Sequence, residues 1–77
     1  STDQQVEEEV ITQIENSKIR RVLWELPENQ RQAVVLKFLE GMENQEIAQT
    51  MNKPVGAVKA LQQRGLQAIR KKLKVKL

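Results

Sequence analysis

The chain lacks several residue types on which enzymes and metal proteins depend. Among its 77 residues there is no cysteine, no histidine and no tyrosine. Without cysteine it can form neither a disulfide nor a thiolate metal site, and without histidine it lacks the commonest general base and a principal zinc ligand. Serine and threonine are few, and the three glycines form no phosphate-binding loop. We therefore expect a protein that is not an enzyme and that binds no metal or cofactor.

Long apolar runs are also missing. No stretch approaches the roughly 20 apolar residues that span a bilayer, and the first residues are acidic and polar, unlike a signal peptide. We therefore expect a soluble, cytoplasmic protein. A chain this short buries only about 60% of its unfolded surface, which favours one small all-α domain built from local contacts.

The first 26 residues show helical patterns with one break. Thr2 and Gln5 form a capping-box pattern, and apolar stripes follow at three- and four-residue steps. The stripe shifts at Asn16 and Ser17. Residues 1–16 are therefore predicted to be an N-terminal helical extension, and whether residues 1–26 form one helix or two stays open. Trp24 lies off the main stripe, so we expect it at the core edge, with a partner contact as the second interpretation.

Residues 27–40 have the signals of a helix of about four turns. Pro27 suits the first helical position, and Gly41 suits the left-handed residue that follows a helix. The apolar residues are too many for one narrow stripe, so this helix should lie at the centre of the core. Residues 17–42 are thus expected to supply the first two core helices.

Residues 43–73 show a short helix, a tight turn and a long helix. Pro54 disfavours helical geometry in the residue before it, so the break belongs at residues 52–54. Either Glu43 or Asn44 would cap the short helix. The apolar stripe of the long helix consists of Val58, Leu61, Gly65 and Ile69.

The two glycines of the long helix, Gly56 and Gly65, are predicted to be close-packing positions, with Gly65 against the third helix. Two helices joined by so few residues pack at a steep angle. The expected architecture is therefore a small four-helix domain with a C-terminal helix-turn-helix, a winged-helix-like DNA-binding fold without a wing.

The side of the long helix opposite its apolar stripe carries small, amide-bearing and cationic residues and no carboxylate. Amides and guanidinium groups bond to base edges, small residues let a helix enter the major groove, and cations contact phosphates. An ordinary solvated face would explain any one of these residues, but their combination favours DNA. With neighbours in the short helix and the turn, the candidate DNA-binding residues are Asn44, Lys53, Val55, Gly56, Ala57, Lys59, Ala60, Gln63, Arg64, Gln67 and Lys71.

Charge is segregated along the chain. Residues 1–40 carry eight acidic and five basic side chains, whereas residues 41–77, which end in a basic tail at 74–77, carry two acidic and eight basic ones. An unopposed basic half is typical of a protein that binds a polyanion. A membrane surface is the competing polyanion, but residues 55–68 offer mainly Ala, Gly and Gln where a membrane-binding helix needs bulky apolar residues.

Short motifs give the chain a resemblance to a known family. They are Leu-Pro-Glu at 26–28, Phe-Leu-Glu-Gly-Met at 38–42, Glu-Ile-Ala at 46–48, Pro-Val-Gly-Ala-Val-Lys at 54–59, and Arg64. In this order and spacing the chain resembles region 4 of bacterial sigma factors of the extracytoplasmic-function (ECF) class. The resemblance implies a four-helix domain whose last helix enters the major groove of the −35 promoter element. It also implies two protein partners, the flap of the RNA polymerase β subunit and an anti-sigma factor.

The chain departs from the family pattern in the long helix. Where many members read Lys-Ser-Arg-Leu-His-Arg-Ala, residues 59–65 read Lys-Ala-Leu-Gln-Gln-Arg-Gly, so the promoter sequence cannot be transferred. Region 2 of the family has no counterpart in these residues, which leaves a fragment of a sigma factor or a free-standing region-4-like protein. Two other functions stay open. They are the helix-turn-helix output domain of a response regulator and a module that binds polymerase or an anti-sigma factor without reading DNA.

Four helices of this size cannot enclose every apolar residue, and an uncovered patch usually marks a partner site. We expect a partner helix to bind there. Its acidic face could also cover Lys59 and Arg64, so that one partner surface controls both functions. The candidate partner-binding residues are Val34, Val35, Phe38, Leu39, Leu66, Ile69 and Leu73.

Overall fold

The computed structural model describes residues 17–73, which are helical apart from short connections. The first helical segment covers residues 17–25. It is followed by α2 (Glu28–Val34), the π-helix η1 (Val35–Leu39), α3 (Asn44–Met51) and α4 (Val55–Leu73). Since these residues contain no strand, the all-α prediction is confirmed. The predicted N-terminal extension (1–16) and basic tail (74–77) lie outside the described residues, and with them the question whether residues 1–26 form one helix or two.

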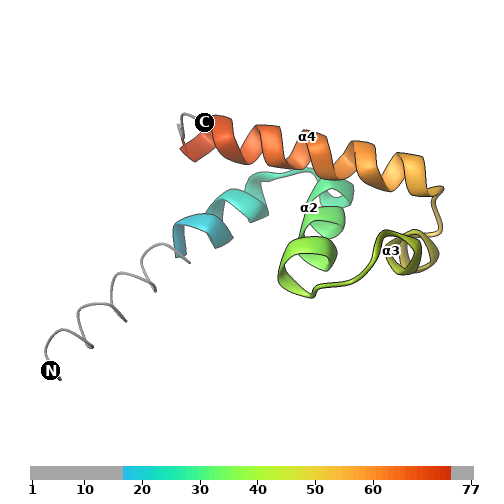
Figure 1. The fold of residues 1–77 in the computed structure, drawn as a ribbon. Helices are drawn as coiled ribbons and strands as arrows, with labels where there is room; N and C mark the ends of the chain where they lie inside the picture. The colour runs from blue at the N-terminus through green and yellow to red at the C-terminus, as the bar shows by residue number, and fades with distance from the viewer. Residues whose placement is uncertain (1–16, 74–77) are drawn as a thin grey trace, which may run out of the picture.

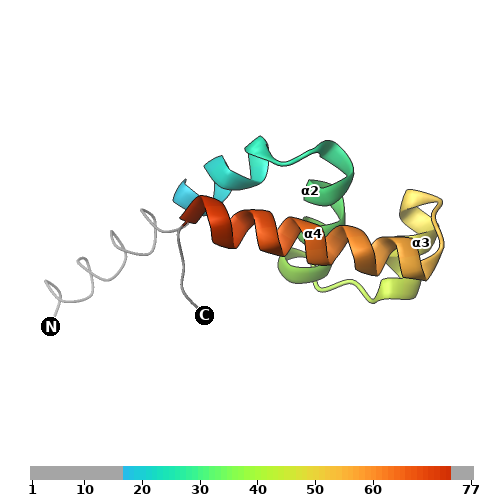
Figure 2. The same ribbon diagram turned by 90° about the horizontal axis from the view of Figure 1, so that it is seen from above.

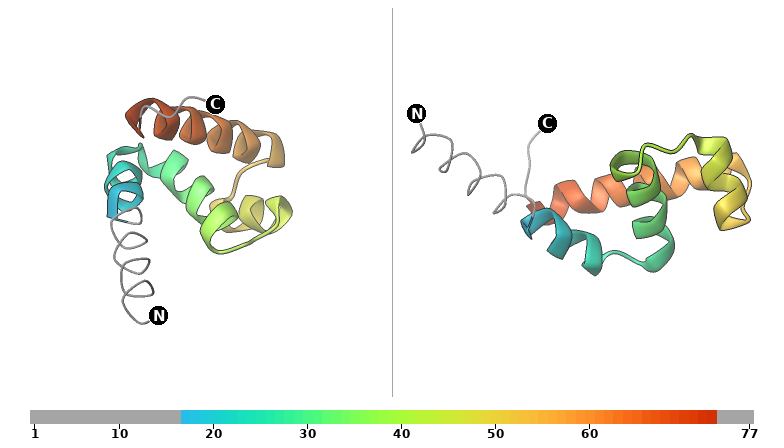
Figure 3. Two further views of the ribbon diagram at one scale, coloured as in Figure 1. Left: turned by 60° about the vertical axis from the view of Figure 1, so that its left-hand side comes forward. Right: turned by 90° about the horizontal axis from the view of Figure 1, so that it is seen from below.

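The long helix α4 is the element on which the others assemble. In Figure 1 it runs along one side of the domain, with the first helical segment beside its C-terminal half, α2 beneath its middle and α3 at its N-terminal end. Figure 2 shows α4 crossing over α2 from above, and Figure 3 shows the other helices gathered on one side of α4. The opposite side of α4 is therefore left uncovered by the described helices.

The interior has two core clusters, joined by the continuous helix that α2 and η1 form. The first core cluster buries Leu23, Leu26 and Val34, with Val35, Ala68 and Ile69 packed against it. The second core cluster buries Ile47, Ala48 and Val58, with Leu36, Met42, Met51 and Val55 packed against it. Val34 of α2 and Val35 of η1 enter the first cluster, and Leu36 of η1 enters the second, which agrees with the central position predicted for this helix.

Gly65 allows α4 to pack closely on α2. A Cβ built on Gly65 would lie 2.6 Å from Cγ2 of Val34 and 3.4 Å from the carbonyl oxygen of Gln30. The prediction that Gly65 packs on the third helix is therefore wrong, because the atoms that a Cβ at Gly65 would meet all belong to α2. The prediction of close packing is also wrong for Gly56, since nothing lies within 4 Å of a Cβ built there.

The helix predicted at residues 27–40 is present but differs at both ends. Pro27 is the N-cap and not the first helical residue, because its own backbone is extended (ψ 145°) while its carbonyl accepts the Arg31 N–H at 2.9 Å. The last turn widens into η1, where the Glu40 N–H bonds to the Val35 carbonyl at 3.0 Å. Gly41 then takes the expected left-handed conformation, with φ +72°.

The turn of the helix-turn-helix lies at residues 52–54, as predicted. Asn52 is left-handed, with φ 56°, and its N–H bonds to the Gln49 carbonyl at 3.3 Å. The Lys53 N–H bonds to the Ala48 carbonyl at 3.0 Å. These two bonds form the Schellman pattern, which satisfies carbonyl groups at the end of a helix and reverses the chain.

The N-cap of α3 is Glu43, whose backbone is extended (ψ 154°) and whose carbonyl accepts the Ile47 N–H at 3.0 Å. Glu43 makes no side-chain capping bond. The alternative of Asn44 as the cap is wrong, because Asn44 is already the first helical residue.

Candidate nucleic-acid interface

One face of α4 points away from the other helices and is open to solvent. Its residues recur every three or four positions, so they form a stripe along a helix roughly 28 Å long. The sequence of α4 contains no Asp or Glu, so no carboxylate of its own interrupts this stripe. We call it the α4 outer face. Its exposed members are Gly56, Lys59, Gln63, Arg64, Gln67 and Lys71.

The remaining candidate DNA-binding residues are half-buried. Ala57 and Ala60 belong to α4, where their small side chains add little bulk, and Lys53 lies in the turn. Val55 packs against the second core cluster, so its side chain contributes to the fold. The structure therefore gathers most of the α4 candidates on one face and sets Asn44 and Val55 apart from them.

Asn44 is engaged inside the domain. Its side-chain oxygen accepts a hydrogen bond from Nε2 of Gln62 at 3.0 Å, which links the first turn of α3 to the middle of α4. Gln62 is only 7% exposed. The sequence prediction assigned Leu61 to the core stripe and missed Gln62, but Leu61 is half-buried. A stripe running from Val58 through Gln62 to Gly65, in steps of four and three, would have found it.

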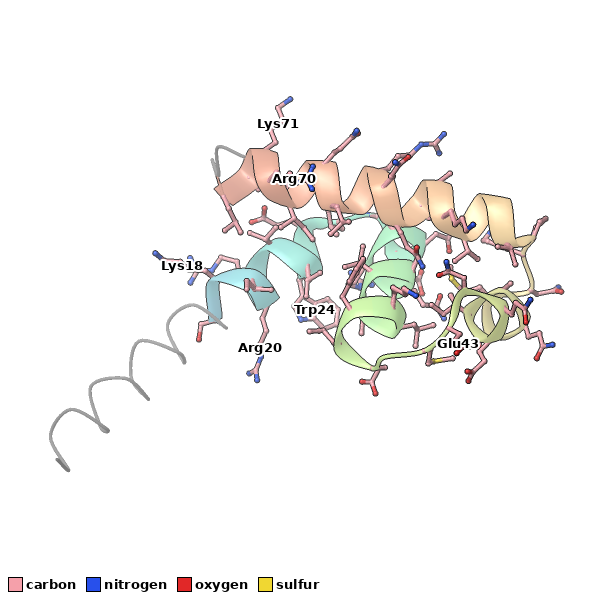
Figure 4. All side chains as sticks on the ribbon, viewed as in Figure 1. Lys18, Arg20, Trp24, Glu43, Arg70 and Lys71 are labelled. Carbon is pink, nitrogen blue, oxygen red and sulfur yellow. The ribbon has the colours of Figure 1, made fainter. Side chains whose placement is uncertain are left out.

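The C-terminal end of α4 is cationic but not wholly unopposed. Nζ of Lys72 lies 3.1 Å from Oε2 of Glu25 in the first helical segment, in a partly exposed ion pair. Lys72 is thus an exception to the expected unopposed charge. Arg70 and Lys71 are exposed, and Figure 4 shows Lys71 pointing away from the rest of the domain.

A second surface lies on the first helical segment and α2. Trp24 is 73% exposed, so its prediction as a core-edge residue is wrong: Leu23 turns into the first core cluster and leaves Trp24 outside. The guanidinium carbon of Arg31 lies 4.5 Å from the centre of the indole ring, in a cation–π contact. Beside this pair is a groove of about 400 Å³, the Trp24 groove. It is lined by Arg20, Leu23, Trp24, Glu28, Arg31, Gln32 and Val35.

The candidate partner-binding residues divide into buried and exposed groups. Val34 is 4% exposed inside the first core cluster, so its assignment to a partner surface is wrong. Phe38 and Leu39 are 54% and 64% exposed, one turn beyond Val35 of the Trp24 groove. Val35, Leu66, Ile69 and Leu73 are half-buried. Large apolar side chains are therefore available to a partner at Trp24, Phe38 and Leu39.

Comparison with known proteins identifies the family. The family model for sigma-70, region 4 matches residues 16–69. The chain belongs to the sigma-70 region 4 family. The ECF RNA polymerase sigma factor SigW of Bacillus subtilis is 35% identical to this region 4 domain over 68 residues, which are 87% of the chain and 36% of SigW. A chain of the solved RsbN–BldN complex matches the domain with a TM-score of 0.71 and 28% identity, over 83% of this chain and 46% of that one.

This region 4 domain is a sigma-factor DNA-binding domain, so the resemblance predicted from the motifs is confirmed. The family match also excludes the response-regulator alternative, since such an output domain would have matched a different helix-turn-helix family. A regulatory DNA-binding domain of this kind is not an enzyme. Within residues 17–73, no helix combines the length and the apolar character needed to cross a membrane.

Proposed function

We propose that this domain recognises the −35 promoter element by placing α4 in the major groove, as the region 4 part of a sigma factor that directs transcription initiation in the bacterial cytoplasm. The observation that carries the proposal is the α4 outer face, which is exposed, amide-bearing and cationic. This face lies on the side of α4 that the described helices leave uncovered (Figure 1). The major groove of B-DNA is wide enough to admit an α-helix.

The residues of the α4 outer face are assigned different roles. Gln63 and Arg64 carry the amide and guanidinium groups that bond to base edges. Lys53 and Lys59 carry point charges, which suit phosphates and hold the domain on DNA of any sequence. Gly56 has open space around it, so the DNA backbone can approach α4 closely at this position.

The test separates base recognition from phosphate binding. Arg64→Ala and Gln63→Ala should each weaken the preference for particular −35 base pairs by about 1 to 3 kcal/mol, whereas Lys53→Ala should weaken binding to all sequences alike. Binding is measured by fluorescence anisotropy over a set of single-base variants of the element. Arg21→Ala, an exposed arginine of the first helical segment, is the matched control. A uniform loss in Arg64→Ala would make Arg64 a phosphate ligand.

Salt dependence tests the electrostatic part of the proposal. With about four to six phosphate contacts, the affinity should fall with salt at a log–log slope of roughly −4 to −5. The isolated domain should therefore bind weakly at moderate salt and with modest specificity. An affinity that does not change between low and moderate salt would contradict the proposal that cationic side chains bind the DNA phosphates.

We place the docking of the RNA polymerase β flap on the Trp24 groove and the neighbouring Phe38 and Leu39. Exposed aromatic side chains beside a groove are the usual anchors of a protein interface. The groove is lined by the first helical segment, α2 and the start of η1, whereas the α4 outer face belongs to another helix. Flap and DNA could then bind together. We therefore favour two separate surfaces over the single controlling surface expected from the sequence.

An anti-sigma factor is the second proposed partner of the Trp24 groove. The structurally similar chain belongs to a complex of RsbN with BldN, which supports a protein partner for this kind of domain. An apolar helix bound in the groove would exclude the flap by occupying the same anchors, even with the α4 outer face left free.

Variants of the groove test both protein partners. Trp24→Ala should weaken binding to a purified β-flap fragment by about 2 kcal/mol, because truncation of a central aromatic anchor typically costs that much. Calorimetric titration measures the loss, and Ile19→Ala, an apolar residue outside the groove, is the control. An unchanged flap affinity in both Trp24→Ala and Phe38→Glu would place docking elsewhere. Normal flap binding by a wild-type domain with no promoter preference would instead favour an interaction module that does not read DNA.

A further inference from the structure

Gln62 is the only buried polar side chain among residues 17–73. It lies in the middle of α4 and directly precedes Gln63 and Arg64, to which we assign base contacts. A buried amide is costly unless it is hydrogen-bonded, and here the partner is the Asn44 side-chain oxygen, 3.0 Å from Nε2 of Gln62. The bond therefore joins two helices through the interior of the helix-turn-helix.

The position of this bond complements that of the turn. The Schellman turn at Asn52 and Lys53 holds the C-terminal end of α3 to the start of α4. Asn44 is at the other end of α3, roughly 10 Å away along a helix of this length. The two attachments together leave α3 little freedom to pivot on α4.

Apolar packing between α3 and α4 cannot supply this constraint by itself. Ile47, Ala48 and Val58 of the second core cluster are held by the hydrophobic effect, which is not directional. A small rotation of α4 about its axis would keep these side chains buried. The same rotation would break the bond between Gln62 and Asn44 and leave a buried amide unpaired, which is unfavourable.

We propose that Gln62 is a positioning residue for DNA recognition, and that its bond to Asn44 fixes the rotation of α4 so that Gln63 and Arg64 face the bases. This inference rests on the proposed function of the α4 outer face. Contacts to bases depend on side-chain placement within about 0.5 Å, so a small rotation weakens them strongly. Phosphate contacts made by long lysine side chains tolerate the same rotation. Asn44, a candidate DNA ligand from the sequence, acts in this account through Gln62.

The experiment compares specific with non-specific binding by the 77-residue chain. Gln62→Met keeps the length of the side chain and removes its amide. We expect the ratio of affinities for a −35 duplex and a scrambled duplex to fall about tenfold, the size expected for loss of one buried hydrogen bond. Affinity for the scrambled duplex should change less than twofold, because no charge is altered. Asn44→Ala should lower the ratio similarly, and the double variant should lower it no further.

Two further variants separate positioning from general stability. The exchange Asn44→Gln with Gln62→Asn keeps the combined length of the two side chains and should restore the ratio to within about threefold of the wild type. Gln49→Met, which replaces an exposed amide of α3, should leave the ratio unchanged. An unchanged ratio in folded Gln62→Met or Asn44→Ala overturns the inference. Unfolding of both, seen by circular dichroism, would show that the bond only holds the fold together and would overturn it as well.

A measurement without DNA keeps this inference distinct from the proposed function. Residual dipolar couplings of the free domain report the orientation of α3 relative to α4. We expect one defined orientation in the wild type and a changed or averaged one in Gln62→Met. If the wild type shows no promoter preference, the proposed function fails, yet an unchanged orientation in Gln62→Met would still refute the positioning role by itself.

Discussion

The two core clusters of this domain are closed to different degrees. In the second core cluster Ile47 and Val58 have no exposed surface, and the buried Gln62 next to it has a hydrogen-bond partner. The first core cluster is continuous with an open groove, beside which Trp24 is largely exposed. The half of the domain that contains the helix-turn-helix thus encloses its core, whereas the other half leaves large apolar side chains exposed. A closely packed helix-turn-helix suits the DNA recognition that we propose, and exposed apolar side chains suit the protein partner that we propose.

The largest expected loss of stability comes from a substitution in the second core cluster. Ile47→Ala should lower the free energy of unfolding by about 2 to 5 kcal/mol, since it removes a fully buried side chain and leaves a cavity. Urea denaturation followed by circular dichroism measures the change. Ile19→Ala, at a position that is 37% exposed, should cost less than about 1 kcal/mol. Equal losses in the two variants would contradict the difference between a closed and an open half.

The next effect concerns the contact of α4 with the open half. Gly65→Ala should lower the free energy of unfolding by about 1 to 3 kcal/mol, because its Cβ would lie 2.6 Å from Cγ2 of Val34. Thermal and urea unfolding give the value. In the background of Val34→Ala, which removes the clashing methyl group, the same substitution should cost much less. A cost that is independent of residue 34 would show that the clash is not its cause.

The second glycine of α4 gives a smaller effect of opposite sign. Gly56→Ala should raise the free energy of unfolding by up to about 1 kcal/mol, since alanine favours a helix and its Cβ meets nothing within 4 Å. Its affinity for promoter DNA should nevertheless fall, because the added methyl group would stand where we propose that the DNA backbone approaches α4. A variant with higher stability and unchanged DNA affinity would exclude close approach at Gly56.

The smallest effect is expected where the end of the first helical segment meets the last turn of α4. Glu25→Gln removes the ion pair with Lys72, whose two side chains are 50% and 39% exposed. Exposed pairs of this kind contribute about 0 to 1 kcal/mol, and salt screens them. We expect a loss below about 0.5 kcal/mol that disappears at high salt, measured by urea unfolding in both conditions. A loss above 1 kcal/mol would mean that the first helical segment depends on this pair.

The sequence predicted the helical architecture and the α4 outer face because both follow from local rules. Helical periodicity placed Gln63 and Gln67 opposite Val58, and Pro54 marked the turn. Left-handed geometry at Gly41 was also predicted locally, because this glycine follows the end of a helix. These features depend on residues within a few positions of one another, and the family match then identified the domain.

The errors concern residues whose environment depends on distant segments. Trp24 was assigned to the core edge because periodicity says which residues share a face, but not where the neighbouring helix ends. Gly65 was matched with the wrong helix for the same reason. Gln62 was missed because an amide does not count in an apolar pattern. Its burial depends on a hydrogen bond to Asn44, which lies 18 positions away in the sequence.

The π-helical turn η1 changes the directions in which side chains point along the continuous helix formed by α2 and η1. Val35 packs against the first core cluster and its neighbour Leu36 against the second. A π turn closes with bonds from residue i+5 to residue i, so it holds one residue more than an α turn. That extra residue shifts the angular register between Val34, which faces α4, and the residues that lead towards α3. Val35 and Leu36, as consecutive helical residues, already point about 100° apart, so one helix supplies two cores that lie in different directions. The wider turn of η1 then changes the face on which the residues after them, Phe38 and Leu39, lie.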